Sequence, residues 1–272
     1  MIYNLEQVYF EVTRRCNLRC DHYCMRGPAQ NIELSKEDVD LFFDQINIGV
    51  IDLLTFGGGE PTLNPGIISY TIDKIIKKGI IVLELGMITN GQIYSQEIVN
   101  AFKRYEKYIK SNDEYNYVMD KYLPGFKLHP ATGIYFSKDD YHQKVKPDVE
   151  KEYRDNGKNI NIGYQCTTKE NIVKTGLATT GYEYRYRLLK TKYEVLDEDT
   201  VNVYGDIDLN ARGLVLNNPV YDYIDADMKN FGHIKDFSMY DFLVNNGIPE
   251  VGTINISEVV RKRKRKIKAR AN

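Results

Sequence analysis

Short apolar runs and helix-like stripes of apolar residues alternate along the first 110 residues. Residues 8–13, 51–56 and 80–88 are mostly apolar runs, a pattern typical of buried strands in a parallel sheet. Between and after them, residues 35–46, 65–79 and 95–109 carry apolar side chains at helical spacing. Ser35 and Ser95 are placed to cap two of these helices, and Pro65 to begin the third. The pattern therefore predicts strand–helix units.

The alternation continues beyond residue 130. Residues 111–130 are polar and rich in tyrosine and predict no element, so we expect an insertion there. Further strands are expected at 132–136, 159–164 and 201–204, and helices at 147–156 and 169–175, while 212–216 is a candidate to pair with a neighbouring strand. Six strand–helix units with right-handed crossovers predict a parallel sheet that can curl into a barrel.

Three of the four cysteines lie in one segment, residues 11–27, EVTRRCNLRCDHYCMRG. On a continuous helix Cys16 and Cys24 would be about 12 Å apart, because each residue rises 1.5 Å. Sulfurs that share one metal must lie within a few ångström of each other, so Cys16, Cys20 and Cys24 can act together only on a loop. Three thiolates without an obvious fourth ligand suit an iron–sulfur cube with one open iron. A zinc loop and three unrelated buried thiols are the alternatives.

This loop resembles the cluster loop of the radical S-adenosylmethionine (SAM) enzymes, in which an aromatic residue, here Tyr23, precedes the last cysteine. Residues 56–61, FGGGEP, match the GGE motif that follows the second strand in that family. The family's usual spacing is C-x3-C-x2-C, whereas this loop reads C-x3-C-x3-C, so we expect the extra residue to bulge at Asp21 or His22. The resemblance implies an α/β fold, an open partial (β/α)6 barrel with a small C-terminal extension.

The resemblance also implies a site at the carboxyl ends of the strands. Cys16, Cys20 and Cys24 would hold a single [4Fe-4S] cluster, since the rest of the chain adds only Cys166. The backbone of the glycine segment would bind the amino group of the SAM methionine. The residues expected to bind SAM are Tyr23, Gly58, Gly59, Glu60, Asn90, Ser137, Asp139, Asn161 and Arg154.

Two of the candidate side chains have an equally ordinary interpretation. His142 is a candidate proton donor or acceptor near the substrate, although a lone histidine on a loop is more often structural. Arg154 could pair with the SAM carboxylate or simply lie on the surface.

For function, the resemblance implies reductive cleavage of SAM to methionine and a 5′-deoxyadenosyl radical, which abstracts hydrogen from a substrate. A flavodoxin- or ferredoxin-type protein would supply the electron. A peptide, a nucleotide and a small metabolite all remain open as the substrate. The alternatives are a zinc-binding nucleic-acid module, and a catalytically degenerate radical SAM fold that acts as a binding protein.

Charge and composition refine the expected organisation of these 272 residues. The net charge is −1, but residues 261–270 carry eight Lys or Arg, which leaves 29 basic against 38 acidic residues elsewhere. We expect a barrel core at 1–205, an extension at 206–258 and a basic tail at 259–272. The tail is interpreted as a solvated helix in preference to a nucleic-acid contact. No apolar run approaches the roughly 20 residues that cross a membrane, no signal-peptide pattern is present, and the cysteines form no disulfide framework, so a cytoplasmic location is expected.

Overall fold

Eight strands form one sheet in the computed structural model, which describes residues 2–20, 31–122, 131–138, 142–165, 206–209, 211–217, 229–245, 250, 256–257 and 259–261. The sheet has the order β5-β4-β3-β2-β1-β6-β7-β8. Strands β1 to β6 run parallel, and β7 and β8 are antiparallel to their neighbours. The strands are β1 (Tyr3–Thr13), β2 (Ile48–Gly58), β3 (Ile81–Thr89), β4 (Thr132–Ser137), β5 (Asn161–Gln165), β6 (Asp206–Leu209), β7 (Leu214–Asn217) and β8 (Lys229–His233).

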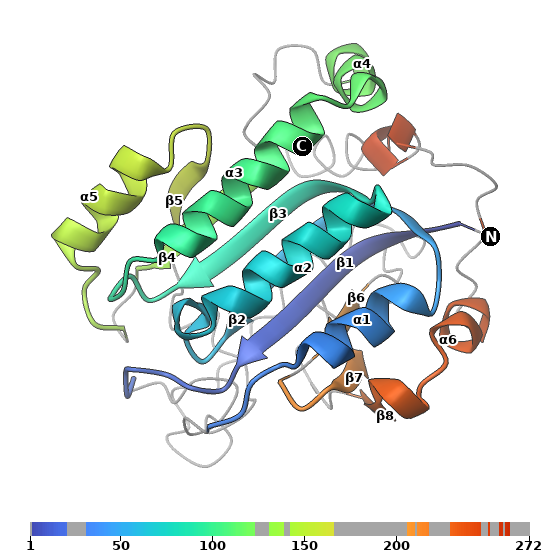
Figure 1. The fold of residues 1–272 in the computed structure, drawn as a ribbon, viewed down its shortest axis with the longest axis horizontal. Helices are drawn as coiled ribbons and strands as arrows, with labels where there is room; N and C mark the ends of the chain where they lie inside the picture. Colours follow the sequence, from blue (N-terminus) through green and yellow to red (C-terminus); the bar gives the residue numbers. More distant parts are fainter. Residues whose placement is uncertain are drawn as a thin grey trace, which may run out of the picture.

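Helices α1, α2 and α3 lie side by side across one face of the sheet (Figure 1). The helices are α1 (Lys36–Asp44), α2 (Pro65–Lys78), α3 (Gln96–Lys110), α4 (Asp113–Tyr122), α5 (Pro147–Asn156) and α6 (Met239–Asn245), with short 3-10 turns at Pro61–Leu63 and Ile234–Asp236. The expected caps are confirmed: the Ser35 side chain accepts the N–H of Asp38, and the Ser95 side chain accepts that of Ile98. Pro65 is the first residue of α2.

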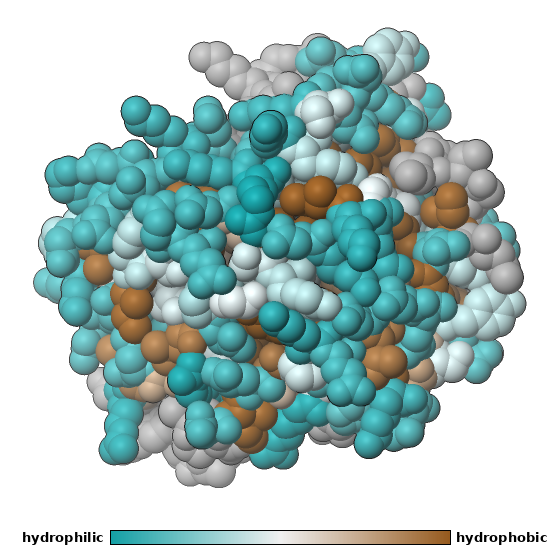
Figure 2. Space-filling view, viewed as in Figure 1, coloured by the Kyte–Doolittle hydropathy of each residue, from teal (hydrophilic) through white to brown (hydrophobic). Residues whose placement is uncertain are grey.

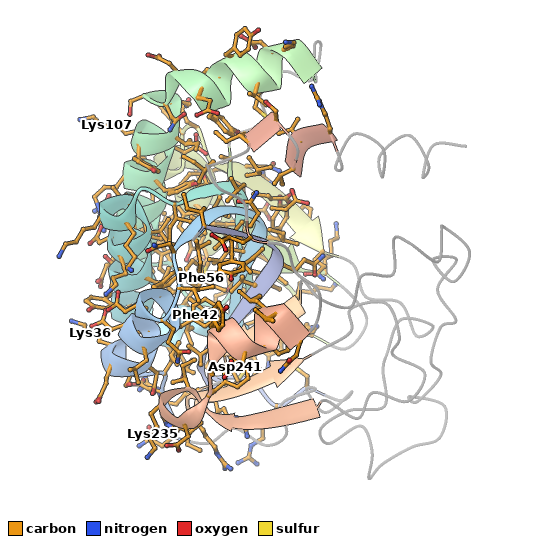
Figure 3. The ribbon with its side chains drawn as sticks, turned by 90° about the vertical axis from the view of Figure 1, so that its right-hand side faces the viewer. Lys36, Phe42, Phe56, Lys107, Lys235 and Asp241 are labelled. Atoms are coloured by element: carbon orange, nitrogen blue, oxygen red, sulfur yellow. The ribbon has the colours of Figure 1, made fainter. Side chains whose placement is uncertain are left out.

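The hydrophobic core lies between these helices and the sheet. The ring of Phe10 on β1 packs edge-on against Phe42 of α1, with centroids 5.1 Å apart, and Phe56 of β2 packs near Phe102 of α3 at 6.5 Å. Figure 3 shows Phe42 and Phe56 inside this layer and Lys36 pointing away from it. The helix-covered side of the molecule is accordingly mostly hydrophilic, with scattered hydrophobic residues (Figure 2).

The opposite face of the sheet, here called the second face, has a different character. Side chains alternate between the faces of a strand, so Tyr9 and Thr55, the neighbours of Phe10 and Phe56, point away from the helices. The pairing registers align Tyr9, Thr55, Gly86, Gly133 and Asn161 in one row across β1 to β5. The side chains of this row are polar or small, whereas those on the helix-covered face are large and apolar. The second face is therefore better suited to binding a ligand than to forming a hydrophobic core.

The expected α/β class with a parallel sheet is confirmed, and most of the boundaries agree. The structure adds α4, where the sequence predicted no element: Tyr115 and Val118, three residues apart, are buried on the core although most of the other residues in this helix are polar. The expected strand 201–204 and helix 169–175 lie outside the described residues, and the sixth parallel strand that is described, β6, pairs with β1. The candidate at 212–216 overlaps β7, which pairs with β6 and β8.

The C-terminal strands continue the same sheet, because β6 adds directly to the free side of β1. The following segment packs beside α1: Gln45 Nε2 donates to the carbonyl of Ile234 at 2.9 Å, and Gln45 Oε1 accepts the N–H of Met239 at 2.8 Å. The division into core, extension and tail stays a prediction. Among the described helices, none is both long enough and apolar enough to cross a membrane.

Candidate functional site

The cysteine loop begins where β1 ends, and its base is closed by backbone hydrogen bonds. The N–H of Arg14 donates to the Ile32 carbonyl at 2.8 Å, and the N–H of Leu34 donates to the Val12 carbonyl at 3.1 Å. The Thr13 hydroxyl also donates to the Ile32 carbonyl, at 3.2 Å. Both ends of the loop are therefore anchored at the carboxyl end of the first strand, the edge at which the sequence analysis expected the site.

Two of the three expected ligands lie in the described part of this loop. The side chains of Cys16 and Cys20 are both partly exposed. The N–H of Leu18 donates to Cys16 Sγ at 3.4 Å, which restrains the position of that sulfur. Tyr23, Cys24 and the expected bulge at Asp21 or His22 lie outside the described residues. The donors present fit a cluster whose third thiolate would come from Cys24.

The glycine segment at the end of β2 is bonded to the cysteine loop through its backbone. Gly59 N–H donates to the Thr13 carbonyl and Glu60 N–H donates to the Arg15 carbonyl, both at 2.8 Å. A Cβ at Gly58 would lie 2.3 Å from the Thr13 oxygen, and one at Gly59 would lie 2.3 Å from the Arg15 oxygen. These glycines therefore allow two protein segments to approach each other, a requirement that the sequence does not reveal and that adds to their expected role in binding SAM.

We expect Gly59→Ala to disturb the cysteine loop, because the added methyl group overlaps the Arg15 carbonyl and the two backbones must separate. Cluster content after anaerobic reconstitution and affinity for SAM should both fall, by about tenfold for SAM, the equivalent of roughly one lost backbone hydrogen bond. The matched control is Gly66→Ala in α2, where the closest atom to the new Cβ is Glu97 Oε1 at 3.9 Å. Unchanged cluster content and SAM affinity in Gly59→Ala would contradict the expectation.

Glu60 is a buried carboxylate that joins the ends of β2 and β3. Its Oε1 accepts the N–H and hydroxyl of Thr62 at 3.1 and 2.6 Å and the hydroxyl of Thr89 at 2.7 Å. Its Oε2 accepts the N–H of Asn90 at 2.9 Å. Burial raises the pKa of Glu60, and these donors oppose the shift. The side chain of Glu60 is thus engaged with protein groups, and its role in this structure is to hold two loops together.

Asn90 follows β3 and connects it to the cysteine loop. Asn90 Nδ2 donates to Asn17 Oδ1 at 2.8 Å, and Asn90 Oδ1 accepts the N–H of Gln92 at 3.0 Å. The resemblance implies a SAM-binding role for Asn90, and it implies none for Asn17. The position of Asn17 directly after Cys16 was the only signal in the sequence that could have pointed to it.

The loop after β4 lies next to the same turn. Gln92 Nε2 donates to the Lys144 carbonyl at 2.9 Å, and the N–H of Lys146 donates to the Gly91 carbonyl at 3.1 Å. His142 precedes these contacts and is partly exposed. Ser137, the last residue of β4, lies on the second face by strand alternation, whereas Asp139 lies outside the described residues. The structure thus places Ser137 at the carboxyl edge of the strand next to β3.

Two candidates lie away from this edge. Asn161 is the first residue of β5, on the second face, and its Nδ2 donates to the hydroxyl of Tyr135 at 3.3 Å. Arg154 forms an ion pair with Glu150 at 2.7 Å and donates to the Ile162 carbonyl at 3.2 Å, on the side of the sheet that α5 covers. The structure does not bring Arg154 to the site. The residue lies on the surface instead, which is the second of the two positions considered for it from the sequence.

The sequence of this region matches a known family. Residues 10–115 match the model of the radical SAM superfamily. This match assigns the segment 10–115, rather than the whole chain, to the radical SAM superfamily. The matched segment runs from β1 into α4 and contains both described cysteines, the glycine segment and Asn90.

Curated relatives share about a hundred residues with this chain. It is 32% identical over 100 residues to the tungsten-containing aldehyde ferredoxin oxidoreductase cofactor-modifying protein of Pyrococcus furiosus, a match that covers 35% of this chain and 26% of the relative. It is 30% identical over 105 residues to the antilisterial bacteriocin subtilosin biosynthesis protein AlbA of Bacillus subtilis, covering 37% of this chain and 22% of the relative. The matches therefore span about a quarter of each relative's length.

Among solved structures, native anSMEcpe with bound AdoMet and Kp18Cys peptide superimposes with a TM-score of 0.52 and 13% sequence identity, covering 88% of this chain and 80% of that one. Native anSMEcpe with bound AdoMet and Cp18Cys peptide gives the same values. At this identity the likeness concerns the fold, and it extends well beyond the residues matched by the family.

Proposed function

We propose that this protein is an enzyme that binds a single [4Fe-4S] cluster and SAM at the carboxyl edge of its parallel sheet. Cys16, Cys20 and Cys24 would be the cluster ligands. The observation that carries the proposal is the backbone pairing between the cysteine loop and the glycine segment, through the N–H groups of Gly59 and Glu60. That pairing puts the two motifs of the superfamily in direct contact. Such contact supports the proposal, because a cluster and SAM can react only when they are bound next to each other.

The chain's own residues have distinct roles in this proposal. The thiols of Cys16 and Cys20 are partly exposed and thus accessible to a metal. Backbone carbonyl groups of the glycine segment are acceptors suited to the ammonium group of SAM, and Ser137 on the second face is suited to its ribose or carboxylate. When bound, the cluster supplies the electron that cleaves SAM to methionine and a 5′-deoxyadenosyl radical, which abstracts hydrogen from the substrate. Among redox proteins, a flavodoxin- or ferredoxin-type donor in the cytoplasm fits this electron requirement.

A peptide is the substrate class that we favour over a nucleotide or a small metabolite. The name of AlbA refers to the biosynthesis of a bacteriocin, and the anSMEcpe structure contains a peptide beside AdoMet. The row of Tyr9, Thr55 and Asn161 on the second face offers hydroxyl and amide groups, which suit the amides of a peptide backbone. His142 stays a candidate for proton transfer near that substrate.

Anaerobic reconstitution tests the proposal directly. We expect about four irons and four sulfides per chain, with broad absorbance in the blue part of the visible range, as for a [4Fe-4S] cluster. With dithionite and SAM, the loaded protein should release 5′-deoxyadenosine and methionine even without substrate. One zinc per chain would contradict the proposal and favour a zinc-binding nucleic-acid module. A full cluster without SAM cleavage under these conditions would indicate a binding protein with a degenerate radical SAM fold.

A further inference from the structure

Asn90 is the residue at which three segments of the site meet. Its backbone N–H donates to Glu60 Oε2 at 2.9 Å, which fixes it to the end of β2. Its side-chain Nδ2 donates to Asn17 Oδ1 at 2.8 Å, and its Oδ1 accepts the N–H of Gln92 at 3.0 Å. Gln92 in turn donates to the Lys144 carbonyl in the loop after β4. Through its backbone and its buried side chain, Asn90 thereby connects the cysteine loop with the loops that follow β2 and β3, and Gln92 extends the connection to the loop after β4.

The direction of the hydrogen bond between the two asparagines is determined by their surroundings. The backbone N–H of Gln92 can only donate, so the atom of Asn90 that faces it must be the oxygen. The Nδ2 group of Asn90 therefore faces Asn17, and Asn17 must present its oxygen as acceptor. Asn90 is buried and held by its neighbours, whereas Asn17 is exposed on the cysteine loop. The donor therefore has a fixed position, and the acceptor is the group that the contact restrains.

The contact lies at a sensitive point of the loop. The backbone bonds that close the loop join residue 14 to residue 32 and residue 34 to residue 12, before the first cysteine and after the last. Asn17 comes directly after Cys16, and the N–H of the next residue, Leu18, donates to Cys16 Sγ. A hydrogen bond at Asn17 thus restrains the segment that carries the thiol, beyond the anchored base.

We propose that Asn17 is a positioning residue, which accepts a hydrogen bond from Asn90 and thereby sets the orientation of the cysteine loop relative to the SAM-binding edge. This inference rests on the proposed function, because it concerns the geometry between the cluster ligands and SAM. Asn17 does not bind either group itself. Its loss should leave the thiols able to hold a cluster, but in a loop whose orientation toward SAM is no longer fixed.

The test compares Asn17→Ala with Asn17→Asp in the cluster-loaded protein. Alanine removes the acceptor, and we expect SAM to bind about three- to tenfold more weakly by anaerobic calorimetry, the effect of one hydrogen bond. Aspartate has the same shape and presents an acceptor oxygen in either orientation, so its affinity should return to within about threefold of wild type. Iron and sulfide content should be the same in all three proteins. The change that SAM causes in the electron paramagnetic resonance spectrum of the reduced cluster should be smaller in Asn17→Ala and restored in Asn17→Asp.

Two further variants separate this contact from a general effect. Asn100→Ala removes another amide–amide pair, in which Gln96 Nε2 donates to Asn100 Oδ1 at 2.9 Å on the exposed side of α3, and it should bind SAM as wild type does. In the background of Asn90→Ala the donor is already gone, so adding Asn17→Ala should cause no further loss of affinity. Additive losses in that double variant would overturn the proposal.

The outcomes also distinguish this inference from the proposed function. If wild type holds no [4Fe-4S] cluster or binds no SAM, the proposed function has failed. If wild type binds both and Asn17→Ala binds SAM with equal affinity, only the positioning role is wrong. SAM affinity in Asn17→Asp as low as in Asn17→Ala would also overturn the positioning role, because the accepting oxygen would then not matter.

Discussion

Replacing Cys16, Cys20 or Cys24 with alanine is expected to abolish the iron–sulfur absorbance of the reconstituted protein. The sequence of the cysteine loop contains these three cysteines and no fourth one that could replace a lost ligand. A cluster with one open iron needs all three thiolates. Cys166→Ala is the control and should keep full iron and sulfide content. Reductive cleavage of SAM should disappear together with the cluster in each of the three variants, measured as 5′-deoxyadenosine formed in the presence of dithionite.

Loss of the cluster in these variants should not reflect unfolding. Cys16 and Cys20 are partly exposed and lie outside the core, so removal of either thiol leaves no buried cavity. Urea unfolding of the cluster-free proteins should therefore give free energies within about 1 kcal/mol of wild type, as for surface substitutions. Full cluster content in Cys24→Ala would contradict the assignment and indicate a site with two cysteine ligands.

The elements nearest the site were predictable because each has a local signal. The run at 51–56 ends in glycines, and β2 ends in the same place, at Gly58. Ser35, Ser95 and Pro65 mark helix starts through short-range chemistry, which needs no knowledge of the fold. The alternation of strands and helices then implied a parallel sheet, whose carboxyl edge is where ligands bind.

Other features depend on contacts between residues that are far apart in the sequence. The bond between Asn17 and Asn90 spans 73 positions, and no local pattern pairs two polar residues across such a distance. Arg154 looked available as a SAM ligand because the sequence could not show which side of the sheet it faces. Helix α4 depends on the burial of Tyr115 and Val118 against the core, which a polar sequence window conceals.

Replacement of Glu60 is expected to destabilise the fold and the site together. In Glu60→Ala the buried N–H groups of Thr62 and Asn90 lose their acceptor, and each unsatisfied group costs about 1–3 kcal/mol. With the cavity added, the free energy of unfolding should fall by about 3–5 kcal/mol. Affinity for SAM should fall as well, because Asn90 and the glycine segment lose the carboxylate that joins them.

Glu106→Ala is a matched control for this effect. Glu106 is also a buried carboxylate, and its Oε1 accepts the N–H and the hydroxyl of Thr132, both at 2.7 Å. It joins α3 to the first residue of β4, away from the candidate site. Its replacement should lower the free energy of unfolding while the residual folded protein binds SAM with wild-type affinity. Equal losses of SAM affinity in both variants would show that Glu60 acts only through global stability.

The pH dependence of stability gives Glu60 a separate signature. Burial raises the pKa of this carboxyl in the folded protein, so between the ordinary pKa of the unfolded chain and the raised pKa the folded state binds more protons. Its contribution to stability is therefore fully present below the unfolded pKa and is lost as pH rises through the folded pKa.

Glu60→Gln tests this pH dependence, because the glutamine side chain cannot titrate. Its single oxygen cannot accept both the hydrogen bonds made to Oε1 and the one made to Oε2. The variant should therefore be less stable than wild type by about 1–3 kcal/mol at acid pH. The difference between the two proteins should narrow as pH rises, measured by urea unfolding of the cluster-free forms. A difference that widens with pH would mean that the folded protein favours the ionised carboxylate, in contradiction to the effect of its burial.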